Sequence, residues 1–202
     1  ERSVFLLIGI IMYKGQKTRE SILREAFLTF NEKGYAAASM TDLMSATGLT
    51  KGGIYNHFQS KEALTSEAFN YAVETISKEI KERIEQAPNK QEKLLVIINH
   101  FTSGGYGNPL FAGGCPLMNA AIESDCGYPV LKSACAEAFQ RFVKIVGEVL
   151  VEFSPDELPD TPEKTALFIV STMEGALMLS QITGSNQPLL VAADTLRKLY
   201  KI

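Results

Sequence analysis

One segment, residues 39–64, constrains the fold of this chain more than any other, and it reads SMTDLMSATGLTKGGIYNHFQSKEAL. Ser39 and Asp42 have the spacing of a capping box, in which a hydroxyl and an acid three residues later satisfy free backbone N–H groups at a helix start. Gly48 is placed to end this short helix, because glycine takes the left-handed conformation without steric cost. Thr50 can then cap a second short helix. Two such helices across so tight a turn predict a helix-turn-helix.

The second short helix, expected to run to Phe58, divides its side chains in an unusual way. Ile54 and Phe58 lie four residues apart and can point inward together. The other face carries donors, two glycines and no acid: Lys51, Gly52, Gly53, Tyr55, Asn56 and His57. Such a face suits a phosphate backbone and a major groove of double-stranded DNA. A generic helical hairpin is the alternative, but it leaves Lys51, His57 and Lys61 unexplained.

The run TGLTKGGIYNHF, followed by SKEAL, closely resembles the TetR family of bacterial transcription regulators. The resemblance covers residues 18–64. One departure is Gly53, where a polar or larger residue is common in the family. Glycine there costs helix stability of roughly 1 kcal/mol and offers no side chain to read a base.

The resemblance implies a role in operator binding for the positions that match the family motif. Phosphate contacts are expected from Lys51, Tyr55, His57 and Lys61, and Gly52 and Gly53 let the backbone approach closely. The positions expected nearest to bases are Thr41, Thr50 and Asn56. The chemistry agrees, since asparagine can pair with adenine and lysine acts as a point charge on phosphate.

The charge of the chain is unevenly distributed. Residues 12–60 carry a balance of +2 and residues 61–202 a balance of -5. This division fits nucleic-acid binding by the first part only. Three cysteines without CxxC spacing and only two histidines indicate neither a disulfide framework nor a metal site, and we expect no cofactor. Reduced thiols in a cytoplasm are the simplest interpretation.

Helical periodicity continues through most of the chain, and alternating strand patterns are not found. We therefore expect an all-α fold of about nine helices. The predicted division is an apolar extension outside the fold (1–13), a DNA-binding domain (14–60) and an effector-binding and dimerisation domain (61–202). The apolar run at the start is too short to span a bilayer, and no membrane association is expected. Further helices are predicted at 18–33, 61–85, 90–102, 116–124, 128–153, 162–183 and 187–200, with a glycine-rich loop at 103–114.

The larger domain is rich in phenylalanine and methionine, which indicates a cavity for a small apolar or aromatic effector. The short stretch CPLMNAAIE, residues 115–123, also resembles a subgroup of TetR-like ligand-binding domains. The candidate effector-binding residues are Phe69, Phe101, Cys115, Leu117, Met118, Asn119, Phe139, Phe142, Met173 and Glu174, of which Asn119 and Glu174 are the polar groups expected at the wall. Resemblance to the family implies a homodimer through the last two long helices, and a repressor that leaves DNA when the effector binds.

Cys115 suggests an alternative, a repressor that senses electrophiles or oxidants through a thiol. It precedes Pro116 at a predicted helix start, where the positive end of the dipole stabilises a thiolate. The opposing interpretation is a small buried hydrophobic residue, the commoner fate of free cysteine. An enzyme is the less favoured class, because no paired carboxylates, catalytic Cys-His-Asp arrangement or phosphate loop is found.

Overall fold

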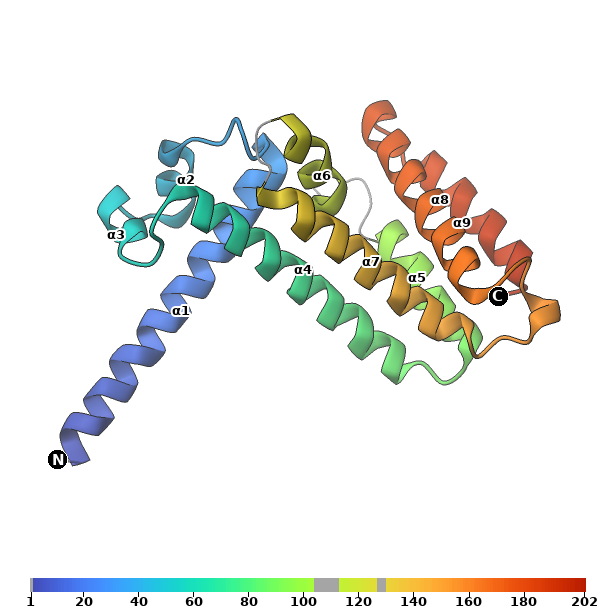
Figure 1. Cartoon of the computed structure of the whole chain (residues 1–202), viewed down its shortest axis with the longest axis horizontal. Coiled ribbons are helices and arrows are strands. Elements are labelled where there is room, and N and C mark those ends of the chain that lie inside the picture. Colours follow the sequence, from blue (N-terminus) through green and yellow to red (C-terminus); the bar gives the residue numbers. More distant parts are fainter. Residues whose placement is uncertain (1, 104–112, 127–129) are drawn as a thin grey trace.

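The computed structural model describes residues 2–103, 113–126 and 130–202 of the chain, and within them all regular structure is helical. The described helices are α1 (Arg2–Lys33), α2 (Met40–Thr47), α3 (Lys51–Tyr55), α4 (Lys61–Gln86), α5 (Lys90–Ser103), α6 (Pro116–Cys126), α7 (Val130–Leu150), the 3-10 turn η2 (Pro155–Glu157), α8 (Pro162–Thr183) and α9 (Gln187–Tyr200). Figure 1 shows α2 and α3 at one end of the molecule and the pair α8 and α9 at the other. The all-α prediction is confirmed.

The helix ends follow the local chemistry of the sequence. The Ser39 hydroxyl accepts a hydrogen bond from the Asp42 N–H (3.2 Å), and the Asp42 carboxylate accepts one from the Ser39 N–H (2.8 Å). This reciprocal pair is the predicted capping box. Gly48 ends α2 with a φ of 68°, in the left-handed region that favours glycine. The Thr50 hydroxyl then accepts from the Gly53 N–H at 3.2 Å and starts α3.

Two helices near the N-terminus differ from the prediction. The first helix, expected from residue 18, extends back without interruption to Arg2, and its N-terminal part projects away from the other helices in Figure 1. The apolar run at the start therefore continues the helix that follows it. In contrast, α3 ends at Tyr55 rather than Phe58. Phe58 is nevertheless buried, because its N–H bonds the Ile54 carbonyl (3.2 Å) and turns the chain inward.

A first hydrophobic core lies under the helix-turn-helix and joins α1, α2 and α3 to the first half of α4, to α6 and to α7. From the N-terminal 60 residues it takes Ile22, Leu23, Ala26, Phe27, Phe30, Tyr35, Ala38, Leu43, Ile54 and Phe58. From later helices it takes Leu64, Ala68, Phe69, Ala72, Val73, Ala120, Leu131, Cys135 and Ala138. This core crosses the predicted boundary at residue 60, so the two parts of the chain share one buried cluster.

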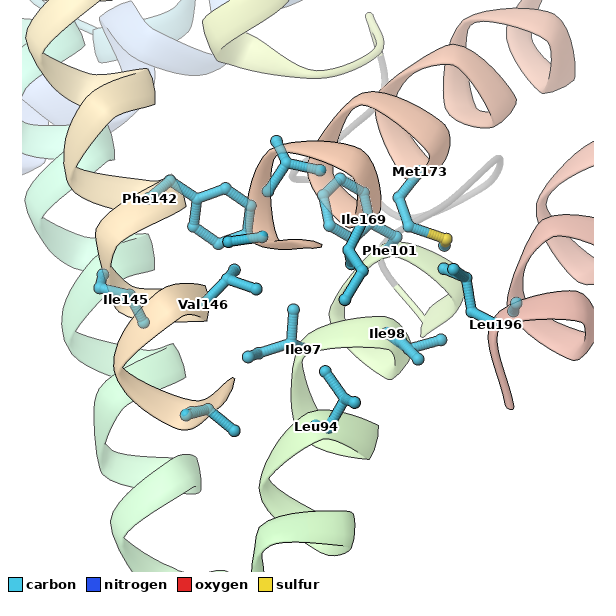
Figure 2. Packing of buried hydrophobic residues seen from close by; sticks show 14 of the residues in the cluster. Leu94, Ile97, Ile98, Phe101, Phe142, Ile145, Val146, Ile169, Met173 and Leu196 are labelled. Atoms are coloured by element: carbon cyan, nitrogen blue, oxygen red, sulfur yellow. The ribbon is translucent and has the colours of Figure 1, made fainter. Parts of the chain in front are cut away.

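A second core fills the larger part of the molecule, between α4, α5, α7, α8 and α9. Figure 2 shows how its side chains interdigitate, with Ile97 and Phe101 from α5 facing Phe142 and Val146 from α7. By length and composition, residues 155–183 are apolar enough to cross a bilayer, but half of the apolar window is buried inside the chain. The other half includes apolar residues of α8 that are exposed on the single chain, such as Phe168 and Ile182.

Candidate DNA-binding surface and effector cavity

The short helix α3 is held against the first core by two buried side chains. Ile54 is fully buried and Phe58 is 3% exposed. The Arg19 guanidinium from α1 lies 4.7 Å from the centroid of the Phe58 ring, a cation–π arrangement that braces the turn after α3. With its apolar side fixed in this way, α3 presents its opposite side to solvent.

Six of the nine residues predicted to bind DNA are exposed on α2, α3 and their junctions: Thr41, Thr50, Lys51, Gly52, Tyr55 and Asn56. The Lys51 ammonium lies 5.9 Å from the Tyr55 ring centroid, so cation and phenol occupy one patch. A Cβ added to Gly52 would meet no atom within 4 Å, and Gly52 does not require a positive φ. Packing within the protomer therefore does not require glycine at this position.

The other three predicted DNA-binding residues are partly buried. His57 packs beside the Phe58 ring, with centroids 6.5 Å apart. Gly53 lies against the Thr50 and Leu49 side chains, where a Cβ would make ordinary contacts of 3.4 Å and 3.5 Å. The Lys61 ammonium donates to the Tyr35 carbonyl at 3.4 Å, which draws it toward the turn between α1 and α2. The structure thus places all nine residues at one end of the molecule, with Lys61 at the edge of the exposed surface.

An apolar cavity of about 40 Å³ lies between α4, α5, α6, α7 and α8. Five of the predicted effector-binding residues line it: Phe101, Cys115, Leu117, Phe142 and Glu174. The remaining lining residues were missed from the sequence: Val73, Ile76, Ser77, His100, Pro116 and Ala138. Val73 and Ile76 belong to the apolar side of α4, and this periodicity was the signal that could have identified them.

The other five predicted effector-binding residues lie outside this cavity. Phe69 is fully buried in the first core, and Met173 is fully buried in the second. Met118 packs against the second core, and Phe139 is half-buried on α7 without lining the cavity. Asn119 points toward α1, where its amide donates to Asn31 Oδ1 (3.0 Å) and to the Gly113 carbonyl (2.7 Å). Composition identifies apolar residues but does not distinguish those that pack in the core from those that line a cavity.

A buried thiol and a buried carboxyl group meet at the cavity wall. Cys115 Sγ lies 3.1 Å from Glu174 Oε1 and donates a hydrogen bond to it. Burial raises the pKa of Glu174 to about 7, partly offset by this hydrogen bond. Burial first, and then the Glu174 charge, raise the pKa of the Cys115 thiol well above its ordinary value. Burial and the neighbouring acid thus favour a neutral thiol over a thiolate before α6, in agreement with the interpretation of Cys115 as a small buried residue.

The cavity also holds an aromatic cluster of His100, Phe101 and Phe142. The His100 ring centroid lies 5.7 Å from that of Phe101 and 6.4 Å from that of Phe142, and the two phenylalanine centroids are 5.8 Å apart. Burial, with a further contribution from the Arg83 charge, lowers the pKa of His100 to about 4. His100 is therefore neutral near pH 7.

The helix that closes the cavity, α6, is also bonded to the N-terminal region. Two oxygens of Glu123 accept hydrogen bonds from the backbone N–H groups of Tyr35 (3.0 Å) and Ala36 (2.8 Å). Asn31 near the end of α1 donates to the Gly114 carbonyl at 3.1 Å. Beside it, a Cβ on Gly113 would fall 1.6 Å from the Asn31 carbonyl oxygen, so only glycine fits this approach. These contacts bond α6 directly to the end of α1 and to the turn that follows it.

Comparison with known proteins places both halves of the chain in one family. Residues 22–68 match the bacterial regulatory proteins of the tetR family, and residues 92–195 match the LmrA/YxaF-like C-terminal domain of transcriptional regulators. The chain is 26% identical to the uncharacterized regulator YxaF of Bacillus subtilis, over 91% of this chain and 95% of that protein. It is 24% identical to the transcriptional repressor DhaR of a Mycobacterium species, over 85% and 86% of the two chains.

A solved structure supports the same family assignment. A TetR transcriptional regulator from Chloroflexus aurantiacus superposes with a TM-score of 0.82 at 35% identity, over 92% of this chain and 95% of that chain. The sequence match, the helix-turn-helix geometry and the fold of the larger part agree. The chain belongs to the TetR family of bacterial transcriptional regulators.

Proposed function

We propose that this regulator is a homodimeric repressor that holds double-stranded operator DNA and is released by a small apolar or aromatic effector. The observation that carries the proposal is the position of α6. Cys115, immediately before the helix, and Leu117 in its first turn line the apolar cavity. Asn119 and Glu123, further along the helix, bond the end of α1 and the turn after it. A ligand in the cavity thus acts on an element attached to the helix-turn-helix.

The DNA-facing part of the proposal rests on the exposed face of α3. Lys51 and Tyr55 contact phosphates, with His57 and Lys61 at the edge, while Thr41, Thr50 and Asn56 lie nearest to bases. The absence of acids from α3 favours a polyanion, and the exposed Gly52 lets DNA approach the backbone. In a two-fold dimer the two copies of α3 read half-sites about 34–36 Å apart.

The dimer forms through α8 and α9, which carry a large exposed apolar surface. Exposed residues there are Leu167, Phe168, Met178, Leu179, Ile182, Leu190, Val191 and Leu199. Between the two helices is a groove whose floor includes the small residues Ser171, Gly175, Ala176 and Ala192. Small residues let helices approach closely, and an apolar surface of this kind marks an interface rather than a solvated face.

Effector binding requires the cavity to widen. Pockets for drug-sized ligands have volumes of about 300–1,000 Å³, whereas this one has about 40 Å³. A ligand therefore binds a conformation in which α6 has moved from α5 and α8, and it shifts the population toward that conformation. Because Asn119 and Glu123 tie α6 to the N-terminal region, the same displacement changes the spacing of the two recognition helices in the dimer.

DNA binding is tested by removing one cation from α3. An operator is first selected from a random duplex library, and affinity is then measured by fluorescence anisotropy across a range of salt concentrations. Lys51→Ala should weaken binding similarly on all sequences and reduce the slope of log K against log[salt] by about one. The matched control is Lys144→Ala, which removes an exposed lysine from α7. If Lys51→Ala combined with Tyr55→Ala binds the operator like wild type, α3 is not the recognition helix.

The thiol-sensing alternative has less support than reversible binding, because Cys115 is buried and its pKa is raised. An enzymatic function has no supporting feature in the cavity, where an acid and a thiol share one hydrogen bond. The family relationship instead favours a regulator that works in the cytoplasm, where its operator DNA is found, and does not favour a membrane partner.

A further inference from the structure

The carboxyl group of Glu174 is incompletely bonded within the folded chain. Its Oε1 atom accepts the hydrogen bond from Cys115, but its Oε2 atom is buried and has no hydrogen-bond partner among the described residues. A buried acceptor without a partner destabilises the folded chain, and more so when it is charged. Glu174 also lines the cavity, so a ligand in the widened cavity would lie beside its side chain.

The surroundings of this acceptor select against most ligand types. No lysine or arginine lines the described cavity, and its one histidine is neutral near pH 7. An anionic ligand would therefore face the carboxyl group without a compensating charge. A purely apolar ligand would offer Oε2 no donor and would leave this atom as unpartnered as it is in the folded chain.

The aromatic cluster at the cavity favours a positively charged ligand. The rings of His100, Phe101 and Phe142 lie within 6.4 Å of one another at the same cavity. Aromatic faces attract organic cations, and this attraction is stronger where water is excluded. A buried acid beside such rings provides both a counter-charge and an acceptor for an ammonium N–H.

We propose that the effector is an organic cation, with an aromatic or aliphatic body among His100, Phe101 and Phe142 and a protonated amine bonded to the Glu174 carboxylate. This inference rests on the proposed function and specifies the ligand class of that cavity. The amine donates to Oε2, the atom left without a partner. Cys115 continues to donate to Oε1 and holds the carboxylate in place.

The test uses three probes of one size that differ in charge: 2-naphthylmethylamine, 2-naphthalenemethanol and 2-naphthoate. Binding to the full-length protein is measured by isothermal titration calorimetry. The amine should bind roughly tenfold or more tightly than the alcohol, and the carboxylate most weakly, because a hydrogen bond to a charged group is stronger than one between neutral groups. Equal affinity for the amine and the alcohol, or undetectable binding of the amine, would overturn the proposal.

The variant Glu174→Gln removes the charge and keeps the shape and an acceptor for Cys115. It should lose the preference for the amine over the alcohol while still binding the alcohol. Glu163→Gln is the matched control, because it makes the same chemical change at an exposed position on α8. If Glu174→Gln keeps the wild-type preference for the amine, Glu174 is not the counter-ion.

A measurement on the wild-type chain keeps the proposal testable if this variant does not fold. Titrations near pH 7 in two buffers of different ionisation enthalpy report the protons released on binding. The titratable groups at the cavity are Glu174, Cys115 and His100, and of these Glu174 alone changes charge near neutrality. The amine should release a fraction of a proton and the alcohol none. Absence of proton release with the amine would contradict the inference.

The outcomes for DNA separate this inference from the proposed function. If the amine binds with the expected preference but leaves the operator complex intact, the ligand class stands and effector-driven release is wrong. If a different, neutral compound releases the operator and the amine shows no preference, release stands and the cationic class is wrong.

Discussion

The carboxylate of Glu123 on α6 accepts a hydrogen bond from the backbone N–H of Tyr35, 88 residues earlier in the chain, at 3.0 Å. The second oxygen accepts from the neighbouring N–H of Ala36 at 2.8 Å. These two amides lie in the turn that leads from α1 into α2. One side chain of the larger, C-terminal part of the chain therefore provides the hydrogen bonds that the turn cannot satisfy itself.

Replacing Glu123 by alanine should destabilise the chain and uncouple its two parts. Two charge-assisted bonds disappear, and because the site is partly exposed we expect a loss of about 1–2 kcal/mol in the free energy of unfolding, measured by urea titration. A larger concentration of effector should then be needed to release DNA. The control is Glu137→Ala on the exposed side of α7. Unchanged stability and an unchanged effector response would show that these bonds do not link α6 to the turn.

Gly52 offers a test that separates DNA contact from folding. A Cβ at this position meets no atom of the protomer, so Gly52→Ala should leave stability unchanged or raise it by up to about 1 kcal/mol through helix propensity. Affinity for the operator should nevertheless fall, because the methyl group occupies space between the backbone and DNA. Thermal unfolding and anisotropy titrations measure the two quantities. A variant with wild-type affinity would place DNA away from the start of α3.

The helix ends were the most predictable part of the fold, because they depend on residues close in sequence. The Ser39–Asp42 capping box, the left-handed Gly48 and the Thr50 cap are all confirmed. The helix at Gln187–Tyr200 has the predicted bounds. Local hydrogen bonds and backbone preferences decide such features, so a single sequence contains the information.

Long-range partners were not predictable in the same way. Asn119 was expected at the cavity wall and instead bonds Asn31, and no spacing in the sequence relates these two amides. The pairing of Cys115 with Glu174 depends on where the residue before α6 lies relative to α8, and burial beside this acid raises the pKa of the thiol instead of lowering it. The sequence identified Asn119 and Cys115 as candidate functional residues, but only the tertiary arrangement determines which residues they bond.

Gly175 lies on the α8 surface proposed to form the dimer. No heavy atom lies within 4 Å of a Cβ built there, so Gly175→Glu should be accommodated within one protomer. In the dimer, the new carboxylate would be buried against apolar residues without a partner, a cost of several kcal/mol. We expect monomers by light scattering and no operator binding. Ser133→Glu, at an exposed position on α7, is the control. A dimeric Gly175→Glu protein would place the interface elsewhere.

Glu174 should make stability fall as the pH rises. Its pKa is raised to about 7 from 4.5, so the folded state holds the proton more tightly than the unfolded state. The stabilisation is complete below pH 4.5 and is lost as the pH rises through about 7. Wild type should therefore lose stability relative to Glu174→Gln, on the order of 2 kcal/mol between about pH 5 and pH 8. Chemical unfolding at several pH values measures the difference.

His100 contributes to the pH dependence of stability with the opposite sign from Glu174. The comparison of wild type with Glu174→Gln removes this contribution. The pKa of His100 is lowered to about 4 from 6.5, so its stabilisation is present above pH 6.5 and is lost as the pH falls toward 4. This contribution is common to both proteins and cancels in their difference. A difference that does not change with pH would show that Glu174 titrates at its ordinary pKa.

Cys115 should resist alkylation in the folded protein. The thiol is 4% exposed and its raised pKa keeps it protonated near neutrality, whereas alkylating reagents attack the thiolate. In a Cys126→Ser background, iodoacetamide should modify Cys115 at least about a hundredfold more slowly than free cysteine. Mass spectrometry of the digested protein follows the reaction, with urea-unfolded protein as the control. Rapid modification of the folded protein would restore thiol sensing as a mechanism.

The hydrophobic core shared across residue 60 determines how this regulator can be recombined with others. Leu64 and Phe69 on α4, Ala120 on α6 and Leu131 on α7 all pack in the core that supports the helix-turn-helix. A chimaera joined at residue 60 would therefore bring a foreign surface against that core, however well the linker is chosen. Substitutions confined to the lining of the cavity would instead leave the faces of α4, α6 and α7 that pack under the helix-turn-helix unchanged.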